Sequence, residues 1–324
     1  MPLVTGSAGE AVRDLQIRLA KLGLDANGDE PGSFGDATST AVRAFQDRRG
    51  LVSDGFCGRE TWSALVEAGY RLGDRLLYLR QPMLRGDDVA TVQQRLGSLG
   101  FDAGRVDGMF GPRTATALED FQRNLGLTVD GVCGPATLQA LHRLGARCAT
   151  AKTVVESVRE LERLRAHPPT LAGRRIVISH LGGLDSLVAA TARLVRANGA
   201  DVITTARSNG SEHAAEANAV GADGVVAIMM QPDASGCSTS FYARAGYEST
   251  AGRLLAQLVQ ERVPGALGVA DDGVHGMSIP ILSETRMPAV LTTLGPGHLV
   301  VEHAGQLATA FTAALVSWAS GEHV

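Results

Sequence analysis

A histidine stands where an apolar run gives way to two glycines, in the stretch RIVISHLGG at residues 175–183. Asp185 follows two residues later. Histidine and carboxylate side chains beyond a strand are the groups that hold a hydrolytic zinc ion, which needs three protein ligands and one open position. The turn LGGLDS also leads into a predicted helix, so its free backbone N–H groups favour a carboxylate or a phosphate.

The elements around this stretch alternate between β-branched runs and helical patterns. We predict strands at Arg175–Ile178, Asp201–Thr204, Gly224–Ile228 and Ala289–Leu294, and helices at Ser186–Asn198, Glu212–Val220, Thr250–Arg262 and Ala304–Ser317. Such alternation predicts an α/β domain with a mostly parallel sheet flanked by helices. The site of such a sheet lies beyond the carboxyl ends of its strands. Asp185 is then interpreted as the N-cap of the helix that follows.

The first half of the chain is a tandem repeat. Residues 34–65 match residues 110–141 at a constant offset of 76, and EAVRDLQIRLAKLG matches DDVATVQQRLGSLG at an offset of 77. Apolar stripes in each copy predict a helical module of three short helices. Pro112 and Pro135 suit first helical turns. The equivalent Cys57 and Cys133 are predicted to fill the same small core position in each copy.

The repeated pattern LQxRLxxLG, then FG, then AVxxFQ and GLxxDGxxGxxTxxAL, resembles the peptidoglycan-binding module. The resemblance implies a three-helix fold and peptidoglycan, or a fragment of it, as ligand. Aromatic residues make up only 4% of the chain, whereas sugar binding usually relies on aromatic platforms, so a protein ligand is an alternative. We expect Trp62 to be a core residue. The predicted domains are modules at 1–72 and 73–146, a linker helix at 147–172 and the α/β domain at 173–324.

The α/β domain resembles zinc-dependent N-acetylmuramoyl-L-alanine amidases in RIVISHLGG, NAVGADGVVAIMM and MPAVLTTLG. That family implies two zinc-binding histidines, one zinc-binding glutamate and one catalytic glutamate. The corresponding positions here hold Leu181, Asp185, Met229 and Thr293. Methionine is a poor zinc ligand, and a threonine hydroxyl does not take a proton from water near neutral pH. We therefore predict no cofactor, no bound metal and no catalytic residue.

Two alternatives remain open at this point. One is an active zinc amidase with rearranged ligands, for which His180, Asp185 and His275 are the candidates. His213, His298 and His303 lie in the same domain, but none has the spacing of a recognisable metal site, and His275 and His298 are expected in loops. The other alternative is a simple peptidoglycan-binding protein.

Composition indicates which partners and which cellular location to expect. A formal net charge of −4 with no basic block argues against nucleic acid as a partner. The sequence has no run of about 18 apolar residues, so we expect no membrane span. The N-terminus carries no basic leader with an apolar core, and the four cysteines lack C-x-x-C spacing, so we expect reduced thiols and a cytoplasmic location.

The order of the domains indicates a more specific family than the amidases as a whole. GYRLGDRLLY, GDDVATVQQRLGSLGF and DGVCGPATL resemble the CwlM family of actinobacterial amidase homologues. This implies a pseudoenzyme that regulates peptidoglycan biosynthesis by binding proteins or precursors, under control of serine/threonine phosphorylation. The implied partners are the UDP-N-acetylglucosamine enolpyruvyl transferase, a forkhead-associated protein, the lipid II flippase and muropeptide or precursor fragments.

Overall fold

The protein is described by a computed structural model, which covers residues 2–145, 160–162, 164, 166, 168–207, 209–231, 234–244 and 247–321. The chain forms two compact units, one holding the repeats and one holding the α/β domain. Most of the linker helix predicted at 147–172 lies outside the described residues, as does Cys148.

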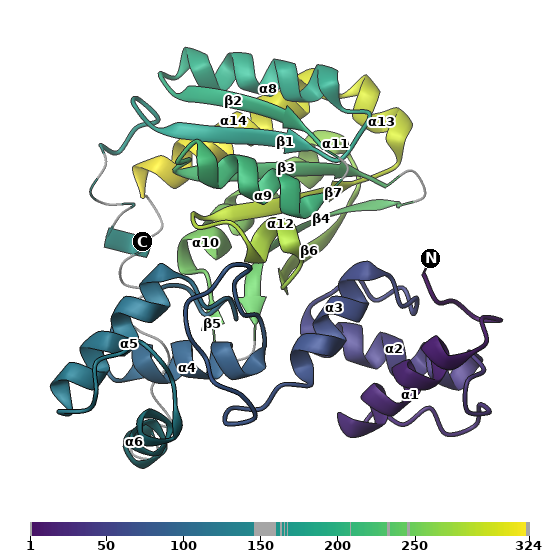
Figure 1. The fold of residues 1–324 in the computed structure, drawn as a ribbon. Helices are drawn as coiled ribbons and strands as arrows, with labels where there is room; N and C mark the ends of the chain where they lie inside the picture. The colour runs from purple at the N-terminus through teal and green to yellow at the C-terminus, as the bar shows by residue number, and fades with distance from the viewer. Residues whose placement is uncertain are drawn as a thin grey trace. The chain divides into compact units, whose positions relative to one another are not determined.

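Each repeat forms three short helices, as its pattern predicts (Figure 1). The first module has α1 (Glu10–Lys21), α2 (Asp36–Arg49) and α3 (Arg59–Ala68), and the second has α4 (Asp87–Ser98), α5 (Pro112–Asn124) and α6 (Pro135–Gly145). Pro112 and Pro135 are the first residues of their helices, where the missing N–H leaves no hydrogen bond unmade. The predicted stripes face the cores through Val12, Leu15, Leu19, Val89, Val92 and Leu96.

A buried glutamine holds the turn between helices in each module. The Gln46 side-chain amide donates to the backbone carbonyl of Phe56 and to Thr61 Oγ1, and its oxygen accepts the Gly55 N–H. Gln122 makes the equivalent bonds in the second module. Gln16 and Gln93 do the same for the turn one helix earlier. These bonds satisfy buried polar groups that the apolar pattern does not reveal.

Cys57 and Cys133 occupy equivalent core positions, as predicted. Each is buried and free, and each pairs through its backbone with a leucine, Leu3 in the first module and Leu77 in the second. Trp62 differs from its prediction, because it is half-buried rather than a core residue. Its ring lies 5.8 Å from the guanidinium carbon of Arg18.

The second unit is built on one mixed sheet of seven strands. Its order is β2-β1-β3-β7-β4-β5, with β6 also paired to β4. The four predicted strands are β1 (Arg175–His180), β2 (Asp201–Ala206), β3 (Gly224–Met230) and β7 (Ala289–Leu294), and they pair in parallel. The strands that sequence reasoning missed are β4 (Gly236–Arg244), β5 (Tyr247–Glu248) and β6 (Ala270–Met277), of which β4 runs antiparallel to β7.

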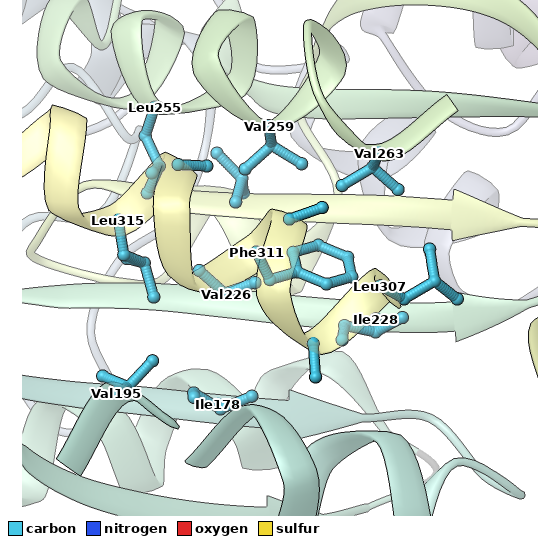
Figure 2. Packing of buried hydrophobic residues seen from close by; sticks show 14 of the residues in the cluster. Ile178, Val195, Val226, Ile228, Leu255, Val259, Val263, Leu307, Phe311 and Leu315 are labelled. Atoms are coloured by element: carbon cyan, nitrogen blue, oxygen red, sulfur yellow. The ribbon is translucent and has the colours of Figure 1, made fainter. Parts of the chain in front are cut away.

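Helices cover both faces of this sheet. The bounds are α8 (Asp185–Ala197), α9 (Gly210–Ala219), α10 (Thr250–Gln260), α11 (Val263–Leu267), α12 (Pro280–Ser283), α13 (Gly297–Glu302) and α14 (Ala304–Ser320). Helices α8, α10, α11 and α14 bury one face, where Ile178, Val226 and Ile228 meet Phe311 (Figure 2). Helices α9 and α12 pack against each other on the opposite face (Figure 1). Among the described residues, no helix is long and apolar enough to cross a bilayer.

Candidate functional site

The edge of the sheet beyond β1, β3 and β7 gathers three of the four residues that the resemblance assigns to the amidase site. Met229 and Thr293 are direct partners in the β3–β7 register, and both are half-buried. Leu181 follows β1, and its N–H donates to the carbonyl of Ile228 over 3.2 Å. The parallel pairing thus places these residues together, as expected for positions at the ends of neighbouring strands.

His180 lies on the other face of the sheet from Met229 and Thr293. It pairs in register with Ile228, which points into the core under α8, and the next residue, Met229, points the opposite way. The His180 side chain is 4% exposed. Its Nδ1 accepts the Gly182 N–H at 3.2 Å, so the ring proton is assigned to Nε2.

The carboxylate of Asp185 lies near that Nε2. Its Oδ1 lies 3.3 Å from His180 Nε2. The prediction that Asp185 caps α8 is wrong by one residue, because Leu184 is the N-cap and Asp185 is the first residue of the helix. Gly182 and Gly183, with φ of 134° and 68°, make the tight turn that brings the carboxylate back to the histidine. His180 and Asp185 are therefore neighbours, and the histidine Nδ1 accepts a hydrogen bond while the Asp185 side chain is 85% exposed.

His275 stands far from this pair in the sheet. It lies in β6 rather than in the expected loop, and β3, β7 and β4 separate β6 from β1. Its Nε2 is 2.8 Å from the carbonyl oxygen of Asp272. The structure does not bring together the rearranged set of His180, Asp185 and His275.

Of the remaining histidines in this unit, His213 is buried in α9. Its Nε2 contacts the Arg207 carbonyl at 2.8 Å, and burial lowers its pKa. His298, in α13, is exposed, and the Nδ1 of His303 lies 3.1 Å from the carbonyl of Leu299.

The residues at the family positions do not fit zinc. Within the described part of the chain, no group of three or more His, Cys, Asp or Glu side chains is placed to hold a metal ion. Leu181 offers no donor atom, Met229 offers a thioether, and Thr293 offers a neutral hydroxyl. A hydrolytic zinc needs three nitrogen, sulfur-thiolate or carboxylate ligands and an open position. We therefore derive no metal-assisted step at this edge.

A second candidate site is a groove on the first module, with a volume of about 750 Å³. Trp62 forms one of its walls, and Cys57 lies between the backbone of Leu3 and the start of α3. Sequence reasoning missed this groove, although Trp62, at the position where the second module has Leu138, was an available signal. The groove is lined by Pro2, Leu3, Ala11, Cys57, Gly58, Arg59, Trp62 and Ser63.

Comparison with known proteins matches both parts of the chain. The model of the putative peptidoglycan binding domain matches residues 8–65 and 85–141. The N-acetylmuramoyl-L-alanine amidase CwlM of Mycobacterium tuberculosis is 36% identical over 329 aligned positions, covering 90% of this chain and 80% of that protein. The chain belongs to the CwlM family.

Two further proteins match less than half of this chain. A probable N-acetylmuramoyl-L-alanine amidase of Bacillus licheniformis is 34% identical over 152 residues, which cover 42% of this chain and 43% of that protein. The crystal structure of N-acetylmuramoyl-L-alanine amidase from Clostridium difficile 630 matches with a TM-score of 0.38 and 20% identity, covering 46% of this chain and 98% of that one.

Proposed function

We propose that this CwlM homologue is a catalytically inactive amidase relative that regulates peptidoglycan biosynthesis in the cytoplasm by binding proteins or precursor fragments. Membership of an amidase family with two peptidoglycan-binding modules supports the connection to the cell wall. Leu181, Met229 and Thr293 offer no nitrogen, thiolate or carboxylate ligand at the sheet edge, which supports the proposal that the protein does not hydrolyse amides.

The observation that carries the proposal is the register pair Met229–Thr293. By the resemblance described above, these residues take the positions of a zinc ligand and the catalytic glutamate of the amidase family. Hydrolysis of an amide near neutral pH needs an activated water and a group that accepts its proton. A thioether and an aliphatic hydroxyl supply neither.

His180 does not restore the missing functions. Its side chain lies on the α8 face of the sheet, away from Met229 and Thr293, and its Nδ1 accepts the Gly182 N–H. A general base must reach the proton that it abstracts, either directly or through one water. The hydrogen bond from the Gly182 N–H to His180 instead stabilises the glycine turn.

The proposed partners are the enolpyruvyl transferase of UDP-N-acetylglucosamine, a forkhead-associated protein and the lipid II flippase. All three follow from the family resemblance, which also implies regulation by serine/threonine phosphorylation. A regulator of precursor synthesis would act where precursors are made, which supports the cytoplasmic location.

The test combines metal analysis with an activity assay on the purified full chain. We expect far less than the one zinc per chain that a working site holds, and no release of peptide from a muramyl-peptide substrate. The His180→Ala and His275→Ala variants should give the same values as the unmodified chain. About one zinc per chain together with peptide release would overturn the proposal in favour of a rearranged amidase.

Capture experiments address the remaining alternative. The tagged full chain, incubated with host cytosol, should retain at least one enzyme or transporter of precursor synthesis. Sedimentation with insoluble peptidoglycan and no retained protein would favour a simple peptidoglycan-binding protein.

A further inference from the structure

An ion pair joins the two helical modules. The helices that pack most closely do so within one module, α1 with α2 and α3, and α4 with α5 and α6. Between the modules, Arg49 Nη1 donates to Asp87 Oδ1 over 2.8 Å, and Arg49 Nη2 donates to Asp87 Oδ2 over 2.6 Å. Arg49 ends α2 of the first module, and Asp87 begins α4 of the second. The pair therefore ties the end of a helix in one module to the start of a helix in the next.

The geometry of this ion pair is favourable. Two parallel hydrogen bonds between a guanidinium and a carboxylate fix both the distance and the angle between the two groups. The side chains of Arg49 and Asp87 are only 23% and 33% exposed, and the Arg49 guanidinium carbon lies 5.5 Å from the centre of the Phe45 ring. Helix dipoles stabilise a cation at the end of one helix and an anion at the start of another. The pair is thus better held than an ordinary exposed ion pair, whose side chains separate freely.

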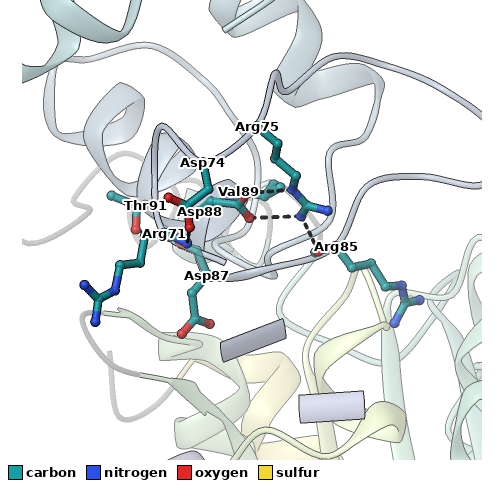
Figure 3. A network of polar contacts seen from close by, with 8 residues as sticks. All are labelled: Arg71, Asp74, Arg75, Arg85, Asp87, Asp88, Val89 and Thr91. Carbon is teal, nitrogen blue, oxygen red and sulfur yellow. Dashed lines mark hydrogen bonds and ion pairs between the residues drawn. The ribbon is translucent and has the colours of Figure 1, made fainter. Parts of the chain in front are cut away.

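The chain between the modules is held at the same junction. Arg75 donates through Nε to Asp88 Oδ2 at 2.7 Å and through Nη2 to Asp88 Oδ1 at 3.1 Å (Figure 3). Its Nη2 also donates to the Arg85 carbonyl at 2.6 Å, and its guanidinium carbon lies 3.6 Å from the centre of the Tyr70 ring. Figure 3 shows the Asp87 carboxylate pointing away from this cluster. The two neighbouring aspartates thus bind different partners.

Residues 70–77 of this connecting chain lie along the second module. A Cβ on Gly73 would lie 3.2 Å from Cδ2 of Leu138, and Cδ2 of Leu76 lies 3.8 Å from where a Cβ on Gly134 would be. Leu77 pairs through its backbone with Cys133. The connection therefore follows the surface of the second module, which limits how far the first module can turn.

The bridge uses residue types that the repeat itself does not require. At the offset of 77, Asp87 corresponds to Glu10, whose side chain is 88% exposed and pairs with Arg13 of its own helix. At the offset of 76, Arg49 corresponds to the apolar Leu125. Each module forms its three helices with either residue type at these positions. The contact between the modules, and not the interior of either one, accounts for the Arg49–Asp87 pair.

We propose that the Arg49–Asp87 pair is a latch that holds the two modules in one fixed orientation, so that the tandem repeat acts as one recognition unit. Domains joined by a small contact otherwise move relative to each other. Two surfaces at a fixed separation favour a partner that contacts both modules at once, because the second contact is already in place when the first forms. The inference goes beyond the proposed function, since it applies to a protein partner and to a precursor fragment alike.

The distance between the modules tests the latch. Nitroxide labels on Lys21→Cys, at the end of α1, and on Asn124→Cys, at the end of α5, report this distance by double electron–electron resonance in the full chain. Cys148→Ser is included so that the labels react only at the introduced cysteines. Cys57, Cys133 and Cys237 are buried with a raised pKa, so their thiols react poorly. We expect one narrow distance distribution at low salt.

Removal of either charge should release the latch. Arg49→Met keeps the length of the side chain and loses the guanidinium, and Asp87→Asn keeps the shape of the side chain and loses the charge. Each variant should replace the narrow distribution by a broad one, while the circular dichroism spectrum of the helices stays unchanged. Arg13→Met is the matched control, because it breaks the ion pair at the equivalent position of the first module and should leave the distribution narrow.

Salt provides a second measurement of the same latch. The Debye length falls to about 3 Å at about 1 M salt, which screens a partly exposed ion pair. The unmodified chain should therefore show the broad distribution at that salt concentration. Arg49→Met should show no further change on addition of salt.

Two results would overturn the proposal. One is a broad distribution in the unmodified chain at low salt, which would mean that the modules move independently. The other is a narrow distribution that both Arg49→Met and Asp87→Asn retain, which would assign the fixed orientation to the connecting chain alone. Neither result depends on zinc content, hydrolysis or captured proteins, so failure here is distinguishable from failure of the proposed function.

Discussion

The two helical modules have similar interiors and differ on one surface. In the first, the Gln46 amide lies 2.7, 3.0 and 3.1 Å from Asp54 Oδ1, the Phe56 carbonyl and Thr61 Oγ1. In the second, Gln122 makes the same bonds over 2.8, 3.0 and 3.1 Å. Yet the surface beside α3 is a groove lined by Trp62, while its equivalent beside α6 lies under residues 70–77.

This difference separates what forms the fold from what selects a ligand. The glutamine networks satisfy buried groups and leave little freedom to change. The groove positions contribute mainly to the surface, so Ala11 and Asp88, or Arg59 and Pro135, can differ without altering the helices. The two modules can then share one fold and still differ in the residues they present at this surface.

The largest effect should come from the shared glutamines. Gln46→Leu and Gln122→Leu each leave a buried N–H, at Gly55 or Gly131, without its acceptor. We expect each variant to lose about 3 kcal/mol of the free energy of unfolding, because unsatisfied buried polar groups cost about 1–3 kcal/mol each. Urea denaturation followed by circular dichroism measures the loss.

The exposed Gln139 provides the matched control. Gln139→Leu, on α6, should change the stability by less than about 0.5 kcal/mol. If only one of the two variants, Gln46→Leu or Gln122→Leu, lowers the free energy of unfolding, the two interiors are not built alike.

A smaller effect is expected from the arginine that closes the second module. Asp88 is 1% exposed and Arg75 is 23% exposed at their side chains, and the Val89 N–H also donates to Asp88. Arg75→Met should therefore cost about 2 kcal/mol, less than the full penalty of a buried unpaired charge. Adding Asp88→Ala, the residue type at Ala11, should recover at least half of that loss.

Urea denaturation of the single and double variants measures this coupling. If Arg75→Met alone leaves the stability unchanged, the ion pair does not hold residues 70–77 in place.

Sequence patterns predicted the parts of the fold that local chemistry determines. The apolar stripes from Val12 to Leu22 and from Val89 to Leu99 predicted α1 and α4, and the β-branched runs predicted β1, β2, β3 and β7. The strand β6 was missed because ADDGVHGM has acidic and glycine residues in place of a β-branched pattern, and it becomes a strand by pairing with β4.

At the candidate sites, too, some features follow from the local sequence and others do not. His180 and Met229 lie on opposite faces of the sheet, since the side-chain period of a strand is two residues. The hydrogen bond from Gly182 and the contact with Asp185 depend on the path of the turn. The groove depends on which chain segment covers which module, and no local pattern carries that information.

The smallest expected effect is an absence of difference between two thiols. Cys57 and Cys133 are 3% and 4% exposed, and burial raises the pKa of Cys57 to about 12 and that of Cys133 to about 11. Arg95 partly opposes the rise at Cys133. Since the thiolate is the reactive form, the native chain at pH 8 should leave both cysteines unmodified by iodoacetamide. Peptide mapping by mass spectrometry should find both alkylated only in urea. Cys57 lies in the groove, so preferential alkylation of Cys57 in the native chain would mean that the open module exposes its core, and that the difference between the modules extends below their surfaces.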